Sequence, residues 1–334
     1  RKIEDSFLSA LAEGGFQVGE LAKCYFPGGH SIESPDYEEA LHRTNELLKL
    51  DRVIIYEAVI RCKNLFIRTD ILIKNKNQIE LVEVKAKSID YANEEFFLNR
   101  NGSISSEWKP YISDVAFQKY VLQNAFPNYK VSAFLMLADK QAQCPTDGLN
   151  QKFKIIKDAS GRKKVVITQE LTNLGLSEPI LCRVNVDACC DVVYSSRYGD
   201  DGSMNFSEYV NHLSDCSEQN IKIPSFPSSV CAGCEFTASE EEEKTGLKSG
   251  YKECWKEFFG WEDEDFNEPT IFDIWNFRNK DQLIQRGCIK MADITEDDIS
   301  PSNDSRPGIS TSERQWLQVQ KAQKKDESAW FDVQ

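Results

Sequence analysis

The 334-residue sequence contains no run of about 18 or more apolar residues. Because a helix needs about 20 predominantly apolar residues to cross a bilayer, we expect no membrane span and no membrane partner. The first residues, RKIEDSFLSALAEGG, lack the continuous apolar stretch and the cleavage site of a secretory signal peptide. They also lack an initiator Met, so we expect a fragment or a processed form.

The sequence also lacks an excess of positive charge. It has 40 Lys and Arg against 54 Asp and Glu, which gives a net charge of −14. Because nucleic-acid phosphates are bound mainly by Lys and Arg, this composition counts against a protein that coats nucleic acid through its overall charge. A local basic cleft remains compatible with it, since basic residues are denser between Arg61 and Lys87 and again in QKFKIIKDASGRKKVVI.

Eleven cysteines occur without a secretion signal. This combination predicts reduced thiols, a cytoplasmic location and a metal site rather than disulfides. Cys231 and Cys234 form a C-x-x-C pair, and Cys254 follows after an acidic insertion. A C-x-x-C pair is a common chelating unit for Zn²⁺ or an iron–sulfur cluster. The competing interpretation is three unrelated thiols.

Helical and strand-like segments succeed one another in the first half of the chain. Residues 1–50 read as helical, with one helix in EDSFLSALAEGG that ends on its glycines and another in SPDYEEALHRTNELLKL. Three strand-like runs follow, RVIIYEAVI, LFIRTDILI and QIELVEVKA, joined by short polar connections that suit antiparallel hairpins. A helix, YISDVAFQKYVLQNAF, then leads to the strand KVSAFLMLA. This order predicts an α/β fold with a mixed central sheet flanked by helices.

The second half of the chain is organised differently. FKIIKDASGRKKVVITQEL predicts a hairpin that turns at Ser160–Gly161, and EPILCRVNVDACCDVV predicts a further strand. After Trp261 the sequence becomes acidic and helical, with a flexible joint in SPSNDSRPGIS. The predicted regions are a helical part at 1–50, a core with an inserted hairpin at 51–225, a cysteine segment at 226–262 and an acidic helical part at 263–334.

Charged residues interrupt two of the apolar strands. Glu83 and Lys85 are two apart on one strand and therefore project from the same face of the sheet. If the second and third strands pair as a hairpin, Asp70 can lie across from Glu83. Two carboxylates could then bind Mg²⁺ or Mn²⁺ for phosphodiester hydrolysis, with Lys85 acting on the attacking water or the phosphate. The competing interpretation is a solvated strand face. The candidate metal ligands are Glu57, Asp70, Glu83 and Val84.

This arrangement, Asp70 followed by Glu83-Val84-Lys85, resembles the D…E-x-K signature of the PD-(D/E)xK nuclease superfamily. The segment DVAFQKYVL resembles the Gln/Tyr helix motif of its RecB-like exonuclease branch. The resemblance implies a restriction-endonuclease-like core in which Gln118 and Tyr120 help to hold the active site and the nucleic acid. The usual motif has its Tyr four residues after the Gln, where this sequence has Leu122.

Together with GFQVGELAKCYFPGG, these motifs resemble a bacterial family that joins an iron–sulfur RecB-like nuclease domain to a DEDD-type exonuclease-like domain. The resemblance covers roughly residues 15–290. Related nucleases hold a [4Fe-4S] cluster with one N-terminal and three C-terminal cysteines, which implies Cys231, Cys234 and Cys254 here. Cys24 is the early candidate for the fourth ligand, and Zn²⁺ is the alternative metal. The fallback ligands are Cys216 and Cys288.

The leading prediction is therefore a metal-dependent, exonuclease-like deoxyribonuclease, with DNA favoured over RNA. By resemblance, DNA repair and anti-phage defence are the candidate pathways, and a downstream domain or a protein is a candidate partner. One alternative is a catalytically inactive nuclease fold that binds nucleic acid or protein. Another is a redox-sensing or metal-sensing protein built around the cysteines.

Overall fold

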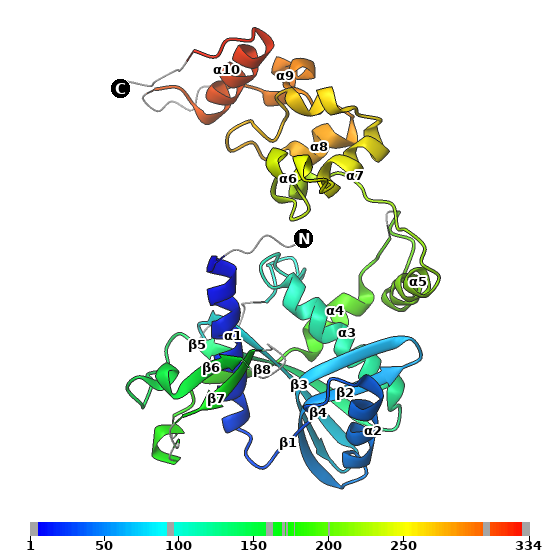
Figure 1. Cartoon of the computed structure of the whole chain (residues 1–334), viewed down its shortest axis with the longest axis vertical. Coiled ribbons are helices and arrows are strands. Elements are labelled where there is room, and N and C mark those ends of the chain that lie inside the picture. Colours follow the sequence, from blue (N-terminus) through cyan, green and yellow to red (C-terminus); the bar gives the residue numbers. More distant parts are fainter. Residues whose placement is uncertain are drawn as a thin grey trace. The chain divides into compact units, whose positions relative to one another are not determined.

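The computed structural model describes residues 6–91, 97–157, 163–168, 171, 173–176, 178–199, 201–302 and 308–328. The chain divides into two units between Lys222 and Ile223. Each unit is described by itself below (Figure 1).

A mixed sheet forms the centre of the N-terminal unit, with the strand order β1-β2-β3-β4-β5-β8. As predicted, β2, β3 and β4 are joined as antiparallel hairpins, whereas β4 and β5 run parallel. β1 pairs parallel to β2, and β8 pairs antiparallel to β5. The predicted α/β class with a mixed, helix-flanked sheet is therefore confirmed. The strands are β1 (His30–Ser31), β2 (Arg52–Cys62), β3 (Leu65–Asn75), β4 (Gln78–Ile89), β5 (Lys130–Asp139) and β8 (Leu181–Asn185).

The two faces of this sheet belong to different cores because neighbouring residues of a strand point to opposite sides. Ile71 and Val82 pack with Leu21 of α1 (Ser6–Cys24). Leu72 and Leu81, the next residues along β3 and β4, pack with residues of the remaining helices. These helices are α2 (Tyr37–Leu47), α3 (Lys109–Ala125), α4 (Asp187–Ser195) and α5 (Phe206–Glu218).

A two-stranded ribbon of β6 (Phe153–Lys157) and β7 (Lys163–Ile167) lies beside α1 in Figure 1. This ribbon is the predicted hairpin, and its predicted turn at Ser160–Gly161 lies outside the described residues. The short helices η1 (Leu149–Lys152) and η2 (Asn173–Leu176) flank it in the sequence.

Two sequence-based boundaries are wrong. The first helix does not end at Gly14–Gly15 but continues to Cys24, because Leu21 and Ala22 are buried against the sheet and this packing outweighs the weak helix propensity of glycine. The strand predicted over residues 178–193 ends at Asn185. From Asp187 the chain forms α4, whose buried face contains Cys189, Cys190 and Val193.

The C-terminal unit is built from short helices around one core, in which Trp255 is fully buried. Residues of the predicted cysteine segment and of the predicted acidic region share this core, so the two regions form one unit. The helices are η3 (Ser229–Gly233), α6 (Glu240–Lys244), α7 (Gly250–Phe259), η4 (Asp263–Asn267), α8 (Lys280–Gln285), η5 (Met291–Asp293), α9 (Glu296–Ile299) and α10 (Thr311–Gln323).

Part of the predicted flexible joint, residues 303–307, lies outside the described residues. Within the described part of the chain, no helix combines the length and the apolar character that a membrane span requires.

Candidate active site

Glu83 and Lys85 lie on β4 and project from the same side of the strand, as their spacing predicts. The Lys85 ammonium donates a hydrogen bond to Glu83 Oε1 at 2.7 Å, and Glu83 is only 6% exposed. Val82 and Val84 point the other way, into the core that α1 covers. The two charged groups are thus held at the opposite face of the sheet by the alternation of β4.

Asp70 lies on β3, next to these residues. Ile71 is paired with Val82, so the next position of the hairpin brings Asp70 opposite Glu83. The Val84 amide N–H donates a hydrogen bond to Asp70 Oδ2 at 2.7 Å. Burial and, after it, the negative charge of Glu83 raise the pKa of Asp70 from 3.8 to about 7. The Glu83 carboxylate is therefore close enough to oppose the ionisation of Asp70.

Helix α3 packs on the face of the sheet opposite α1 and contributes Gln118 and Asp114. Gln118 Nε2 donates hydrogen bonds to Glu83 Oε2 at 2.9 Å and to Asp114 Oδ1 at 3.0 Å. Asp114 Oδ2 in turn accepts a hydrogen bond from Lys85 Nζ at 2.9 Å. Glu83, Lys85, Asp114 and Gln118 thus form a closed ring of hydrogen bonds between β4 and α3.

Asp114 was not among the residues predicted from the sequence. Its signal is the D-x-x-x-Q spacing to Gln118, because residues four apart on a helix lie on the same face. That spacing becomes informative only once the face of α3 that meets β4 is known.

The charge state of the lysine follows from its two partners. Burial lowers the pKa of Lys85, but the ion pairs with Glu83 and Asp114 raise it by more, so the net shift is upward. Burial also raises the pKa of Glu83, while its bond to Lys85 acts in the opposite direction. Lys85 is therefore a protonated hydrogen-bond donor at neutral pH, suited to stabilising negative charge rather than to removing a proton.

Glu57 lies on β2, the strand that borders β3 on the side opposite β4. It has a positive φ of 58°, and β2–β3 pairing is interrupted at this residue, between the Tyr56–Ile71 and Ala58–Thr69 pairs. Irregular strand positions of this kind often re-aim a side chain near a functional site. The Glu57 carboxylate lies 3.6 Å from Lys23 Nζ of α1, and its charge contributes to the raised pKa of Asp70.

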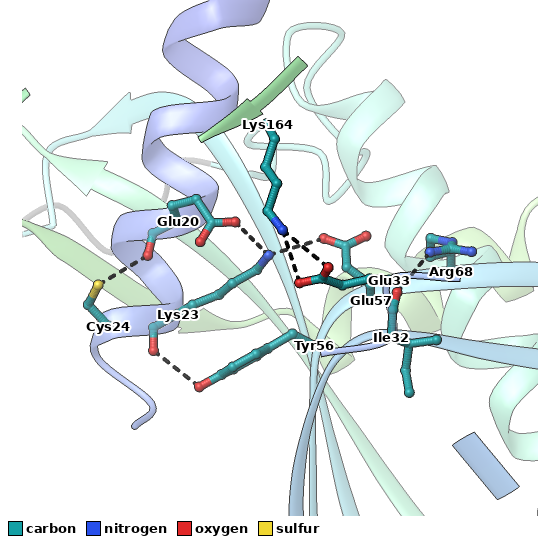
Figure 2. Close-up of polar contacts among 9 residues, drawn as sticks. All are labelled: Glu20, Lys23, Cys24, Ile32, Glu33, Tyr56, Glu57, Arg68 and Lys164. Atoms are coloured by element: carbon teal, nitrogen blue, oxygen red, sulfur yellow. Dashed lines mark hydrogen bonds and ion pairs between the residues drawn. The ribbon is translucent and has the colours of Figure 1, made fainter. Parts of the chain in front are cut away.

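Figure 2 shows how α1 approaches this region. Lys23 lies between two carboxylates, with Glu20 Oε1 at 2.7 Å and Glu57 Oε1 at 3.6 Å. Although burial lowers the pKa of Lys23, its bonds to Glu20 and Glu57 raise it above the ordinary value. Lys23 therefore remains charged and holds Glu57 on the side of the sheet that faces α1.

The structure does not bring Tyr120 to this group. Its hydroxyl is hydrogen-bonded to Ser207 Oγ at 2.7 Å, and its ring packs edge-on against Phe206 of α5. The physical reason is the helical period, since residues two apart on a helix point about 200° apart. With Gln118 facing Glu83, Tyr120 is directed toward α5.

Among the described residues, no three His, Cys, Asp or Glu side chains form a group that could hold a metal ion by themselves. Mg²⁺ is, however, commonly bound by one or two carboxylates, with water and substrate phosphates as the remaining ligands. Asp70 and Glu83 fit this requirement, because they are neighbouring oxygen donors and the charge of Glu83 raises the pKa of Asp70. Val84 enters the site through its amide, which fixes Asp70.

The cysteines of the predicted cluster lie in the C-terminal unit. Cys231 belongs to η3 and Cys254 to α7, and both pack against the core around Trp255. After burial, the thiols of Cys231 and Cys234 are among the causes that raise the pKa of Tyr251 to about 12. In this arrangement the three thiols do not come together as a ligand set within the described part of the chain.

Cys24, the candidate fourth ligand, belongs to the N-terminal unit. It lies at the end of α1, where its Sγ donates a hydrogen bond to the Glu20 carbonyl at 3.3 Å. Burial raises the pKa of the Cys24 thiol. The thiol is thus a neutral, helix-bonded group in this structure.

Comparison of the chain with protein-family models, curated proteins and solved structures finds no match.

We expect Asp70→Asn to change the pH dependence of stability. Because folding raises the pKa of Asp70 from 3.8 to about 7, the folded protein keeps a proton that the unfolded chain loses between these values. The contribution of this group is therefore fully present below about pH 4 and is lost as the pH rises through about 7. In metal-free buffer, Asp70→Asn should melt at a higher temperature than wild type at pH 8 and at nearly the same temperature at pH 4.

Thermal unfolding between pH 4 and pH 8 measures this effect, with Asp191→Asn on the exposed side of α4 as the matched control. The control should show the same offset from wild type at every pH. If Asp70→Asn also shows a constant offset, the carboxylate pair is not the source of the pH dependence.

The sequence-based prediction of a cluster has a direct test, since it requires anaerobically purified protein to contain iron and sulfide, or zinc in the alternative case, bound through Cys231, Cys234 and Cys254. Replacing any of the three by Ala should remove most of the bound metal and destabilise the C-terminal unit, since metal binding of this kind is coupled to folding. Elemental analysis and ultraviolet–visible absorption provide the measurement. The exposed thiol Cys144 is the control, and Cys144→Ala should retain the metal. Purified protein that contains neither iron nor zinc would contradict the prediction of a cluster.

Proposed function

We propose that this protein is a metal-dependent nuclease that hydrolyses DNA phosphodiester bonds in the manner of the PD-(D/E)xK enzymes. The observation that carries the proposal is the constellation around β4. Asp70 and Glu83 lie side by side at the hairpin, and Lys85 is bonded to Glu83 on the same face. These are the residue types that metal-assisted phosphodiester hydrolysis needs, in a half-buried setting that strengthens electrostatic interactions.

Each side chain has a separate role in the proposed reaction. Asp70 and Glu83 would hold Mg²⁺ or Mn²⁺, which when bound polarises the phosphate and lowers the pKa of a water molecule. Lys85, kept protonated by its partners, stabilises the negative charge that develops on the phosphate oxygens. Gln118 keeps the Glu83 carboxylate in place through its amide, and the Val84 amide does the same for Asp70.

The proposal also covers the substrate, the mode of cleavage, the pathway and the cellular location, on the basis of the sequence. DNA rather than RNA, an exonuclease-like action and a role in DNA repair or anti-phage defence rest on the family resemblance of the Asp70 and Glu83-Val84-Lys85 motifs. A cytoplasmic location is supported by the eleven cysteines, all of which carry free thiols. A nucleic-acid partner is supported by the local concentration of lysines described below.

The test is cleavage by wild-type protein of linear and circular DNA, in single-stranded and double-stranded form, with RNA as a further substrate. We expect cleavage with Mg²⁺ or Mn²⁺, none with EDTA, and little with Ca²⁺, whose looser coordination positions water poorly. Binding of DNA without cleavage under all these conditions would favour the inactive binding module instead. The observation that favours this second function is the position of Tyr120, whose hydroxyl is bonded to Ser207 of α5 and not to the candidate site.

A further inference from the structure

Positive charge is concentrated in one short segment of this acidic chain. Between Gln151 and Thr168 the sequence has six Lys or Arg and one Asp, while the whole chain has a net charge of −14. We call β6, β7 and the adjoining Lys152 the lysine hairpin. Its described lysines are Lys152, Lys154, Lys157, Lys163 and Lys164.

The lysine hairpin is firmly attached to α1. Phe153 and Val165 on its inner face are buried in the core that also contains Leu21. Gln17 of α1 donates a hydrogen bond to the Phe153 carbonyl at 2.7 Å, and Lys163 is paired with Glu13 at 3.0 Å. The ribbon is therefore held in a defined position on the N-terminal unit.

The outer face of the hairpin is exposed and carries lysines on both strands. The register pairs Lys154 with Val166 and Ile156 with Lys164, so the two lysines lie diagonally across the ribbon. Ile156 is 46% exposed and Val166 37% exposed. Lys154 on this face is exposed. Lys157, which pairs with Lys163 and therefore projects on the same side as Phe153, is also exposed, and within the described part of the chain neither Lys154 nor Lys157 has an ion-pair partner.

The outer face also carries Lys164, which is paired with a carboxylate of the N-terminal unit. Figure 2 shows Lys164 extending from β7 toward Glu33, beside Glu57. Lys164 Nζ lies 3.1 Å from Glu33 Oε2, and both side chains are more than half exposed. A surface ion pair of this kind contributes little to stability, so Lys164 can exchange Glu33 for another anion at small cost. Glu57, in turn, is electrostatically coupled to Asp70.

We propose that the lysine hairpin binds the sugar–phosphate backbone of the DNA on which the N-terminal unit acts. The inference deepens the proposed nuclease function and rests on it. A phosphate backbone approaching this chain meets a net negative charge and a site rich in carboxylates, and both oppose binding. A fixed ribbon of lysines on the same unit offsets this repulsion locally, because each lysine that contacts a phosphate releases a condensed counterion.

The test is the salt dependence of DNA binding in a cleavage-deficient Glu83→Gln background. A fluorescent DNA duplex is titrated with protein at 50–200 mM salt and followed by anisotropy. Replacing Lys154, Lys157 and Lys164 together by Gln should weaken binding. The slope of log K against log [salt] should fall by about 1 for each lysine that no longer neutralises a phosphate, hence by about 3.

A matched triple variant isolates the effect of position from that of charge. Lys49→Gln, Lys63→Gln and Lys76→Gln remove the same charge from exposed lysines in other connections of the N-terminal unit. This control should keep the wild-type slope. As a second measurement, bound DNA should protect Lys154, Lys157 and Lys164 of the unmodified chain from acetylation, but not Lys49, Lys63 and Lys76.

The outcomes separate the two proposals. If wild type cleaves DNA but both triple variants bind with the wild-type slope and no hairpin lysine is protected, the hairpin inference fails and the nuclease function stands. If wild type neither binds nor cleaves nucleic acid, both fail. Binding of the hairpin to anionic lipid vesicles without binding to DNA would also overturn the inference.

Discussion

Lys85→Ala should lower the rate of metal-dependent DNA cleavage by about 10²- to 10⁴-fold, the usual effect of removing one positioned catalytic group. The reason is that Lys85 is the ammonium bonded directly to Glu83, at 2.7 Å, on the face that also carries Asp70. Binding of Mn²⁺ should persist in this variant, because both carboxylates remain. Single-turnover cleavage and Mn²⁺ titration measure the two effects separately.

Three comparison variants make this result specific. Asp70→Asn and Glu83→Gln should lose metal binding and cleavage together, since each removes one of the two adjacent oxygen donors. Lys130→Ala, an exposed lysine at the start of β5, removes the same charge as Lys85→Ala and should retain nearly the full rate. Cleavage by Asp70→Asn, Glu83→Gln and Lys85→Ala at the wild-type rate would end the nuclease proposal.

Trp255→Ala should destabilise the C-terminal unit by about 3–5 kcal/mol, as large-to-small substitutions of buried aromatic residues do. Trp255 is fully buried, and its ring packs against those of Tyr251, Phe259 and Trp261 at 5.0–5.3 Å between centroids. The same core includes residues from α8, η5 and α10. Removal of the indole therefore takes away packing on which most of the short helices depend.

Hydrogen exchange measured by mass spectrometry reports the two units separately in the full chain. Protection of the amides in α7, α8 and α10 should fall by roughly 10²- to 10⁴-fold, whereas protection in β2–β5 should not change. Trp255→Phe is the matched control and should cost less, because it keeps an aromatic ring and removes an indole N–H that is buried without a hydrogen-bond partner in the described structure. Equal losses in both units would show that Trp255 does not define a separate core.

The sequence predicted the part of the fold that depends on short-range patterns. The starts of β2, β3 and β4 follow from their strand-like runs and from the short polar connections between them, although each strand continues two or three residues further than predicted. The presence of α3 follows from its amphipathic helical pattern. The alternation of side chains along β4 placed Glu83 and Lys85 on one face, and the hairpin then brought Asp70 opposite Glu83. Local spacing and strand pairing are therefore sufficient to predict how these three residues lie relative to one another.

Other features were decided by contacts between segments far apart in the chain. Helix α1 continues through Gly14 and Gly15 because Leu21 and Ala22 pack on the sheet, and no local signal contains that information. The side of α3 that meets β4 selects Asp114 and Gln118 and directs Tyr120 toward Ser207. A helix sequence specifies which residues share a face, but only its packing specifies which face meets the site.

The sequence by itself determined the mixed α/β core, the antiparallel hairpins and the common face of Glu83 and Lys85, because each of these follows from a period of two residues or from a short connection. Only the tertiary structure decided that Asp114 closes the hydrogen-bond ring, that Glu57 is held by Lys23 of α1, and that the lysine hairpin lies on α1. These contacts join segments more than 25 residues apart. Their formation depends on burial and packing of whole elements, which no local pattern encodes.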